Sequence, residues 1–176
     1  MSNQLVIAAI GEDRPGLVDS LAGWILDSGC NIADSRMTVL GGEFAVLLLI
    51  EGQWNSLAKL EDQIEQMQER LGMTISLKRT EQKKPSGALL PYAVDIVALD
   101  HPGIVHNLAN FFSRRGINIQ DLSTSNYSAA HTGTQMFSVH MVLDVPGDTQ
   151  IAGLREEFLD VCDQLNLDAV IEPMKG

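Results

Sequence analysis

Two short segments of the chain contain residue types that could bind a small zwitterion. Each segment begins with Asp-x-Pro-Gly and ends with Gly-x-Asn-Ile. A glycine lets a ligand carboxylate approach the main chain closely, because it has no side chain. An asparagine amide offers both a donor and an acceptor, as recognition of a free amino acid requires. The residues concerned are Gly16 and Asn31 in the first segment and Gly103 and Asn118 in the second.

The two segments are copies of one another. Residues recur between them without a gap at a constant offset of 87, as in Asp13 and Asp100. Such identity indicates an internal duplication, and a repeat of this kind fixes the domain organisation before any fold is assigned. The sequence therefore predicts a first domain at residues 1–79, a polar linker at residues 80–90 and a second domain at residues 91–176.

Hydrophobic periodicity gives both copies the same order of elements. In the first copy, an apolar strand at residues 4–12 precedes a helix, and strands at 31–40 and 43–50 are joined by Gly41-Gly42, a hairpin signal. A second helix at 57–71 and a last strand at 73–79 complete the unit. The order β-α-β-β-α-β predicts an α+β fold of two tandem ferredoxin-like units, with antiparallel sheets and helices on one face.

Each Asp-x-Pro-Gly junction also has a structural interpretation. An aspartate can cap a helix, and a proline in the first turn forfeits no helical hydrogen bond. Asp13 and Asp100 are therefore predicted at or beside helix N-caps, and Asp148 or Thr149 is predicted to cap the last helix. The same junction directs backbone N–H groups and the positive helix end at whatever lies above it. The capping and ligand-binding interpretations both stand.

The two predicted sheets differ on the face that the helices leave open. Alternation along the strands places only apolar side chains on that face of the first copy, and such patches are normally covered. We expect this face to be buried against the other repeat or another chain. The apolar residues are Val6, Ala8, Ile10, Leu47 and Leu49, and the polar residues at matching positions of the second copy are Asp95, Ser138, His140 and Asp144.

The second copy carries a longer segment between its two middle strands, at residues 122–137. Its tip is rich in hydroxyl groups and contains Tyr127 and His131. Two interpretations remain open, a protein-docking element and a longer solvated hairpin loop.

Charge and composition exclude several classes of function. The net charge is −11, with 23 acidic and 12 basic residues, and such a field disfavours direct nucleic-acid binding. No signal-peptide pattern and no 18-residue apolar run occur, which predicts a cytoplasmic protein with no membrane segment. Cys30 and Cys162 are then expected to be reduced and buried.

No pattern predicts a catalytic residue, a cofactor or a metal site. His101 and His106 are five residues apart, which is not the spacing of two metal ligands on one helix face. There is no Walker A sequence and no G-x-G-x-x-G. The sequence therefore predicts a protein that is not an enzyme.

The duplicated pattern, within a β-α-β-β-α-β unit, resembles the ACT domain, a regulatory module that senses amino acids. Two such modules with a short linker resemble the glycine cleavage system transcriptional repressor family. The resemblance implies that modules pair side by side into an eight-stranded sheet. It also implies that a ligand binds where the first helix of one module starts, against the second strand of its partner.

Carried onto this chain, the resemblance implies two ligand sites. One joins Gly16 and Leu17 to Asn118, and the other joins Gly103 and Ile104 to Asn31. Modules that bind amino acids commonly have a neutral amide where this chain has Asp13 and Asp100. A carboxylate there repels the carboxylate of a ligand unless it faces the ammonium group or only caps the helix.

The resemblance further implies a regulatory function without DNA binding. The expected partners are a small amino acid, with glycine favoured, and a transcription factor that activates the glycine cleavage operon. Module pairing is expected within one chain, in a homodimer, or in both. The alternative function is a detached regulatory subunit that binds and modulates an enzyme of amino-acid metabolism.

Overall fold

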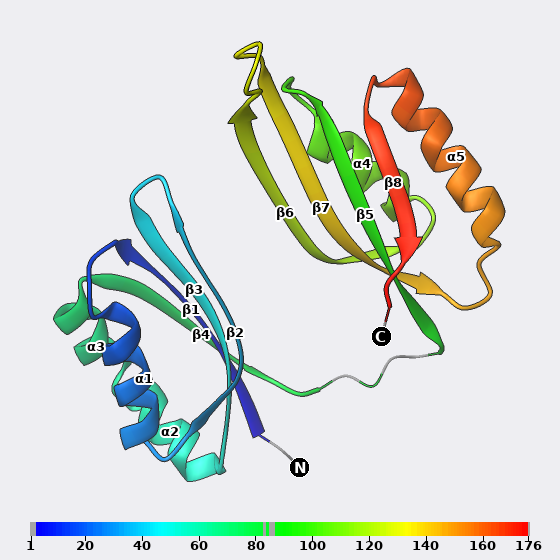
Figure 1. Cartoon of the computed structure of the whole chain (residues 1–176). Helices are drawn as coiled ribbons and strands as arrows, with labels where there is room; N and C mark the ends of the chain where they lie inside the picture. The colour runs from blue at the N-terminus through cyan, green and yellow to red at the C-terminus, as the bar shows by residue number, and fades with distance from the viewer. Residues whose placement is uncertain (1–2, 83, 85–86, 176) are drawn as a thin grey trace. The chain divides into compact units, whose positions relative to one another are not determined.

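A computed structural model of the chain describes residues 3–82, 84 and 87–175. The chain divides into two compact units, Met1–Lys84 and Pro85–Gly176, and each is described by itself (Figure 1). Residues 83 and 85–86, within the predicted linker, and residues 1–2 and 176 lie outside the described residues.

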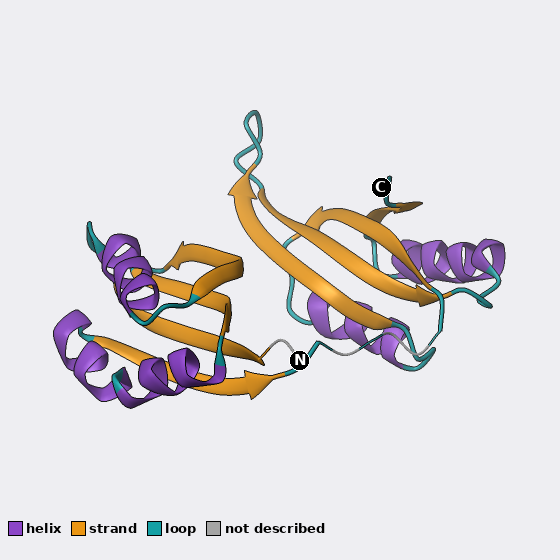
Figure 2. Cartoon of the chain, turned by 90° about the horizontal axis from the view of Figure 1, so that it is seen from below, coloured by secondary structure: helices purple, strands orange, loops and turns teal. Residues whose placement is uncertain are grey.

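The first unit has the predicted β-α-β-β-α-β order, with its second helical segment in two pieces. Its elements are β1 (Asn3–Glu12), α1 (Leu17–Asp27), β2 (Asn31–Leu40), β3 (Glu43–Gly52), α2 (Trp54–Asp62), α3 (Ile64–Leu71) and β4 (Met73–Thr80). The sheet has the strand order β2-β3-β1-β4, and each neighbouring pair is antiparallel. All three helices cover one side of this sheet (Figure 2).

The second unit repeats this architecture. Its elements are β5 (Leu89–Leu99), α4 (Ile104–Ser113), β6 (Asn118–Ser128), β7 (Gln135–Pro146), α5 (Ile151–Gln164) and β8 (Asp168–Pro173). The strand order is β6-β7-β5-β8, again antiparallel throughout. The predicted fold of two tandem ferredoxin-like units, with helices on one face of each sheet, is confirmed.

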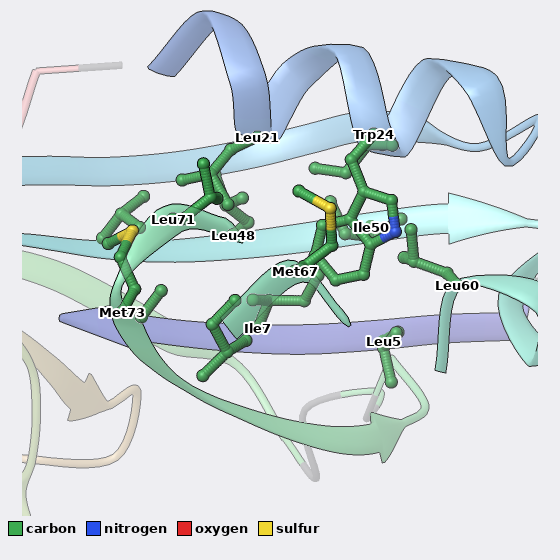
Figure 3. Close-up of a cluster of buried hydrophobic side chains, with 14 of the residues drawn as sticks. Leu5, Ile7, Leu21, Trp24, Leu48, Ile50, Leu60, Met67, Leu71 and Met73 are labelled. Carbon is green, nitrogen blue, oxygen red and sulfur yellow. The ribbon is translucent and has the colours of Figure 1, made fainter. Parts of the chain in front are cut away.

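Each unit has its own hydrophobic core between the sheet and its helices. In the first unit, Leu5 and Ile7 of β1 pack with Leu48 and Ile50 of β3 beneath Trp24 of α1 (Figure 3). In the second unit, Phe158 packs against Phe111 and Phe112, with ring centroids 5.3 and 5.1 Å away. Neither core shares a buried residue with the other.

The second helix of the first unit is interrupted, which corrects the single helix predicted at 57–71. Gln63 separates α2 from α3, with φ −94° and ψ −1°. Its side-chain oxygen accepts a hydrogen bond from the Trp24 indole at 3.0 Å, and it lies 3.4 Å from the Ser28 hydroxyl. This anchor to α1 coincides with the break.

The predicted faces of the first sheet are confirmed within the unit. Phe44, Val46, Leu48 and Ile50 point to the helices and are buried, whereas Leu47 is 53% exposed. We call the side away from the helices the open face of unit 1, and its apolar centre is formed by Val6, Ala8, Ile10, Ala45, Leu47 and Leu49.

The hairpin of the second unit is mostly strand, which corrects the long loop considered for residues 122–137. β6 continues to Ser128 and β7 begins at Gln135, so the loop is only residues 129–134. It is closed by a hydrogen bond from the Ala129 amide to the Thr134 carbonyl, 2.9 Å long. Tyr127 therefore lies on a strand and His131 in the short loop.

The last helix begins differently from the prediction. Its N-cap is Gln150, and neither Asp148 nor Thr149 caps it. Over the described ranges, no helix combines the length and apolar character needed to span a membrane.

Candidate ligand-binding site at the helix and strand starts

Glycines, and not the aspartates, form the N-caps of the first helix in each unit. Gly16 precedes α1 with φ 90°, Gly103 precedes α4 with φ 91°, and neither helix has a side-chain cap. The predicted capping by Asp13 and Asp100 is therefore wrong. The Pro-Gly turn places each aspartate three residues before the cap. There the backbone amide of the aspartate donates a hydrogen bond to the neighbouring hairpin.

The two aspartates are exposed and are anchored through their backbone. The Asp13 amide donates to the Gly42 carbonyl, and the Asp100 amide donates to the Gln135 carbonyl, both over 3.1 Å. The Asp100 carboxylate also accepts a hydrogen bond from Asn126, at 3.1 Å. Sequence reasoning missed Asn126, because it lies in the segment where the second copy departs from the first.

Conformation requires the two cap glycines, and the space beside them is open. A φ near +90° is costly for any residue with a side chain. A Cβ on Gly16 would meet no heavy atom within 4 Å, and one on Gly103 would meet only the Asn107 amide nitrogen at 3.8 Å. The same positions that must be glycine thus leave room for a ligand above the main chain.

The first helical turns offer backbone donors. The amides of the first turn have no acceptor within a helix, and here no cap side chain satisfies them. Leu17 and Ile104 are each 2% exposed, so their side chains belong to the cores and do not line the site. Asp19 lies in the first turn of α1, whereas the first turn of α4 has no acid and has His106 at the equivalent position. The start of α4 is therefore the better environment for an anion.

The two asparagines begin the second strand of each sheet, beside a carboxylate. Asn31 is paired with Glu51, and Asn118 with Asp144. The Asn118 amide donates to Asp144 at 3.4 Å, whereas Glu51 accepts a bond from Gln4 at 2.7 Å. An amide beside a carboxylate can bind an ammonium group. Glu51 was not identified from the sequence, although an acid recurs at this position in both copies.

Within one unit, the helix start and the strand start lie at opposite ends of the sheet. The row of Asn31 and Glu51 contains Gln4, near the beginning of β1, whereas α1 starts beyond Glu12. Eight residues of an antiparallel strand span about 27 Å. The structure therefore does not bring Gly16 to Asn31, or Gly103 to Asn118. The expected combinations of Gly16 with Asn118 and Gly103 with Asn31 join different units, and they remain predictions.

The two thiols lie outside this site. Cys30 and Cys162 are buried, and neither is in a disulfide. Burial raises the pKa of the Cys30 thiol, and burial, with a contribution from Asp163, raises the pKa of Cys162 to about 11. Neither thiol is activated as a nucleophile. No cluster of three potential metal ligands occurs among the residues that the structure describes.

Known proteins are similar to this chain in sequence and in fold. Residues 3–78 match the family model of the ACT domain. The chain is 29% identical over 169 residues to the glycine cleavage system transcriptional repressor of Escherichia coli, which covers 95% of this chain and 88% of that protein. It is 32% identical over 72 residues to a UPF0237 protein of Methanopyrus kandleri, covering 40% of this chain and 80% of that protein.

Two solved structures share the arrangement along almost the whole chain. A provisionally assigned glycine cleavage system transcriptional repressor superposes with a TM-score of 0.74 at 26% identity, covering 100% of this chain and 99% of that chain. An unknown protein from Galdieria sulphuraria superposes with a TM-score of 0.79 at 22% identity, covering 99% of this chain and 100% of that chain. The second likeness concerns the fold.

Proposed function

We propose that this chain, which belongs to the ACT-domain proteins, is a non-enzymatic regulatory protein that senses a small amino acid. It has two ACT-like units in tandem and resembles the glycine cleavage system transcriptional repressors. We further propose that residues 1–79 and 91–176 are the functional modules and residues 80–90 their linker. Its place of action is the cytoplasm, where both thiols stay reduced.

The observation that carries this proposal is the duplication of two complementary half-sites. Each unit has a helix start with uncapped amides at a left-handed glycine, Gly16 or Gly103. Each unit also has an asparagine beside a carboxylate at its other end. The first half-site suits the carboxylate of an amino acid and the second suits its ammonium group.

A complete site in this proposal uses two units. Gly16 and Leu17 of one unit would meet Asn118, and Gly103 and Ile104 would meet Asn31, with the units paired within a chain or in a homodimer. Asp13 and Asp100 do not cap the helices, so in this proposal their carboxylates face the ammonium group, and that of Asp100 also accepts a hydrogen bond from Asn126. The open space above each glycine leaves room for a ligand. Glycine is the proposed effector because of the resemblance to the glycine cleavage system transcriptional repressors.

The proposed protein partner is a DNA-binding activator of the glycine cleavage operon. Repression would occur when this chain binds that transcription factor, and glycine would relieve it. The net charge of −11 supports contact with a DNA-binding protein in preference to contact with DNA. The alternative partner is an enzyme of amino-acid metabolism, with this chain as its detached regulatory subunit.

Calorimetric titration of the purified chain tests the sensing function. We expect saturable heat with glycine, less with serine and least with larger amino acids. Asn118→Ala should weaken glycine binding, while the matched control Asn55→Ala, an exposed asparagine of α2, should not. Absence of heat with every amino acid would refute the sensing function and leave a docking scaffold.

Capture of partners on the immobilised chain tests the regulatory partner. Recovery of a transcription factor, released by glycine, supports the repressor. Recovery of a metabolic enzyme whose activity changes on binding supports the alternative.

A further inference from the structure

The open face of unit 1 has an apolar centre with a polar rim. Cross-strand register groups its side chains in rows that run from β2 through β3 and β1 to β4. The three central rows are Asp34–Leu49–Val6–Lys78, Arg36–Leu47–Ala8–Ser76 and Thr38–Ala45–Ile10–Thr74. The two middle strands thus contribute only apolar residues, and the two edge strands only polar ones.

No element of unit 1 itself covers the centre of this face. Leu47 is 53% and Ile10 is 49% exposed. A shallow hollow of about 160 Å³ lies there, and its lining includes Val6, Leu47 and Leu49. An apolar centre within a polar rim is the anatomy of a protein interface.

The corresponding face of the second unit does not complement this centre. Asp95 and His140 occupy the positions equivalent to Ala8 and Leu47, and they are joined at 2.7 Å. In the adjoining row, Ser125 and Ser138 are joined at 2.7 Å. Packing these groups on an apolar surface would remove water from them without supplying partners, which is costly. The occupant is therefore not the open face of unit 2.

The three central rows of this face are complementary to themselves, whereas the next row holds Glu12 and Glu43. Asp34 and Lys78 lie at opposite ends of the same row, and the Asp34 carboxylate is also paired with Arg36 of its own strand at 2.6 Å. If a second copy packs face to face about a two-fold axis parallel to the strands, β2 of one copy lies over β4 of the other. Asp34 then faces the partner's Lys78, and Lys78 faces the partner's Asp34, while the apolar centres meet.

The size of the face agrees with such a dimer. Four strands, about 4.8 Å apart, with strand lengths of about 25 Å, present roughly 500 Å² per copy when the rows beyond the three central ones are included. Two copies would bury roughly 1,000 Å², the lower limit for a specific interface.

We propose that the open face of unit 1 is a homodimer interface, on which the same face of a second copy docks as a two-layer sandwich. The row of Asn31, Glu51 and Gln4 borders this surface on the same face, whereas the helix start at Gly16 does not belong to it. The proposal goes beyond the sensing function, and its test uses no amino acid, so the two can fail or hold independently.

Light scattering on the full chain after size exclusion tests this interface without any ligand. The wild type is expected at twice the 19.2 kDa chain mass. Leu47→Glu should convert it to the monomer, because the interface would enclose two added carboxylates in its apolar centre. The control is Val97→Glu, on the open face of unit 2 at the position equivalent to Ile10. It should leave the dimer intact.

A charge exchange tests the geometry with little risk to folding. Asp34→Lys alone and Lys78→Asp alone should each weaken the dimer, and the two together should restore it. A wild-type monomer, or a dimer that withstands Leu47→Glu, would overturn the proposal. So would loss of the dimer in Val97→Glu, or failure of the double exchange to restore it.

Discussion

The Asn118 amide donates a hydrogen bond to the Asp144 carboxylate over 3.4 Å, from directly opposed positions of β6 and β7. The matching acid of the first unit, Glu51, accepts its hydrogen bond from Gln4 at 2.7 Å. Gln4 has no counterpart in the second unit, where Pro91 takes its place. The carboxylate of Asp144 is therefore the freer of the two to receive a ligand ammonium group.

We predict that Asp144→Asn weakens amino-acid binding about tenfold or more, since a hydrogen bond to a charged group contributes about 1.5–3 kcal/mol. Glu51→Gln should have a smaller effect. Calorimetric titration measures both, and Asp168→Asn, an exposed acid of β8, is the control for the change in charge. Equal affinity in the Asp144 variant and the wild type would remove this carboxylate from the site.

We predict that Gly16→Ala destabilises the first unit by about 1 kcal/mol or more, because its φ is 90° and not because of a clash. Gly23→Ala is the matched control. Gly23 lies inside α1, and a Cβ there would meet nothing within 4 Å. The control should therefore be stabilising by up to about 1 kcal/mol. Urea unfolding compares the two, and a neutral Gly16 variant would show that the turn relaxes.

We predict that the two units unfold independently of each other. Phe158→Ala removes a fully buried ring that packs on Phe111 and Phe112, at a cost of about 3–5 kcal/mol. Amide exchange should then accelerate in β5 and β7 and stay slow in β1 and β3. Leu48→Ala, in the other core, should give the reverse pattern. Equal acceleration in both sheets would show that the units unfold as one.

We predict a loss of stability at alkaline pH that depends on Cys162. Burial raises the pKa of this thiol from 9.0 to about 11, so the native state favours the protonated form. The resulting stabilisation is complete below about pH 9 and disappears as the pH rises towards 11. The difference in unfolding free energy between the wild type and Cys162→Ala should shrink by up to roughly 2 kcal/mol between pH 8 and pH 11. A constant difference would contradict the prediction.

Alternation and duplication made the sheets predictable from the sequence. In β1 and β3, the residues with period two divide into a buried set, such as Ile7 and Leu48, and an open set, such as Leu47. The Gly41-Gly42 turn was also predictable, since φ values of 60° and 96° there exclude most other residues.

The details of the site depend on contacts that no local pattern encodes. The position of the α1 cap depends on the Pro-Gly turn and on the bond from Asp13 to Gly42, a residue distant in sequence. The pairing of Asn118 with Asp144 depends on a register that shifts between Ile119 and Asp121. The break at Gln63 coincides with a hydrogen bond from another helix. Each requires the tertiary structure.

In the proposed site, the separation of Gly16 from Asn31 along one sheet couples ligand binding to the pairing of units. A ligand that must touch a helix start and a strand start cannot be held by an isolated unit. By thermodynamic reciprocity, every factor by which pairing raises the affinity for the ligand is a factor by which the ligand strengthens pairing. The amino-acid concentration would then set the fraction of units that are paired. A protein partner that binds only the paired or only the unpaired form would respond to that concentration without contacting the ligand.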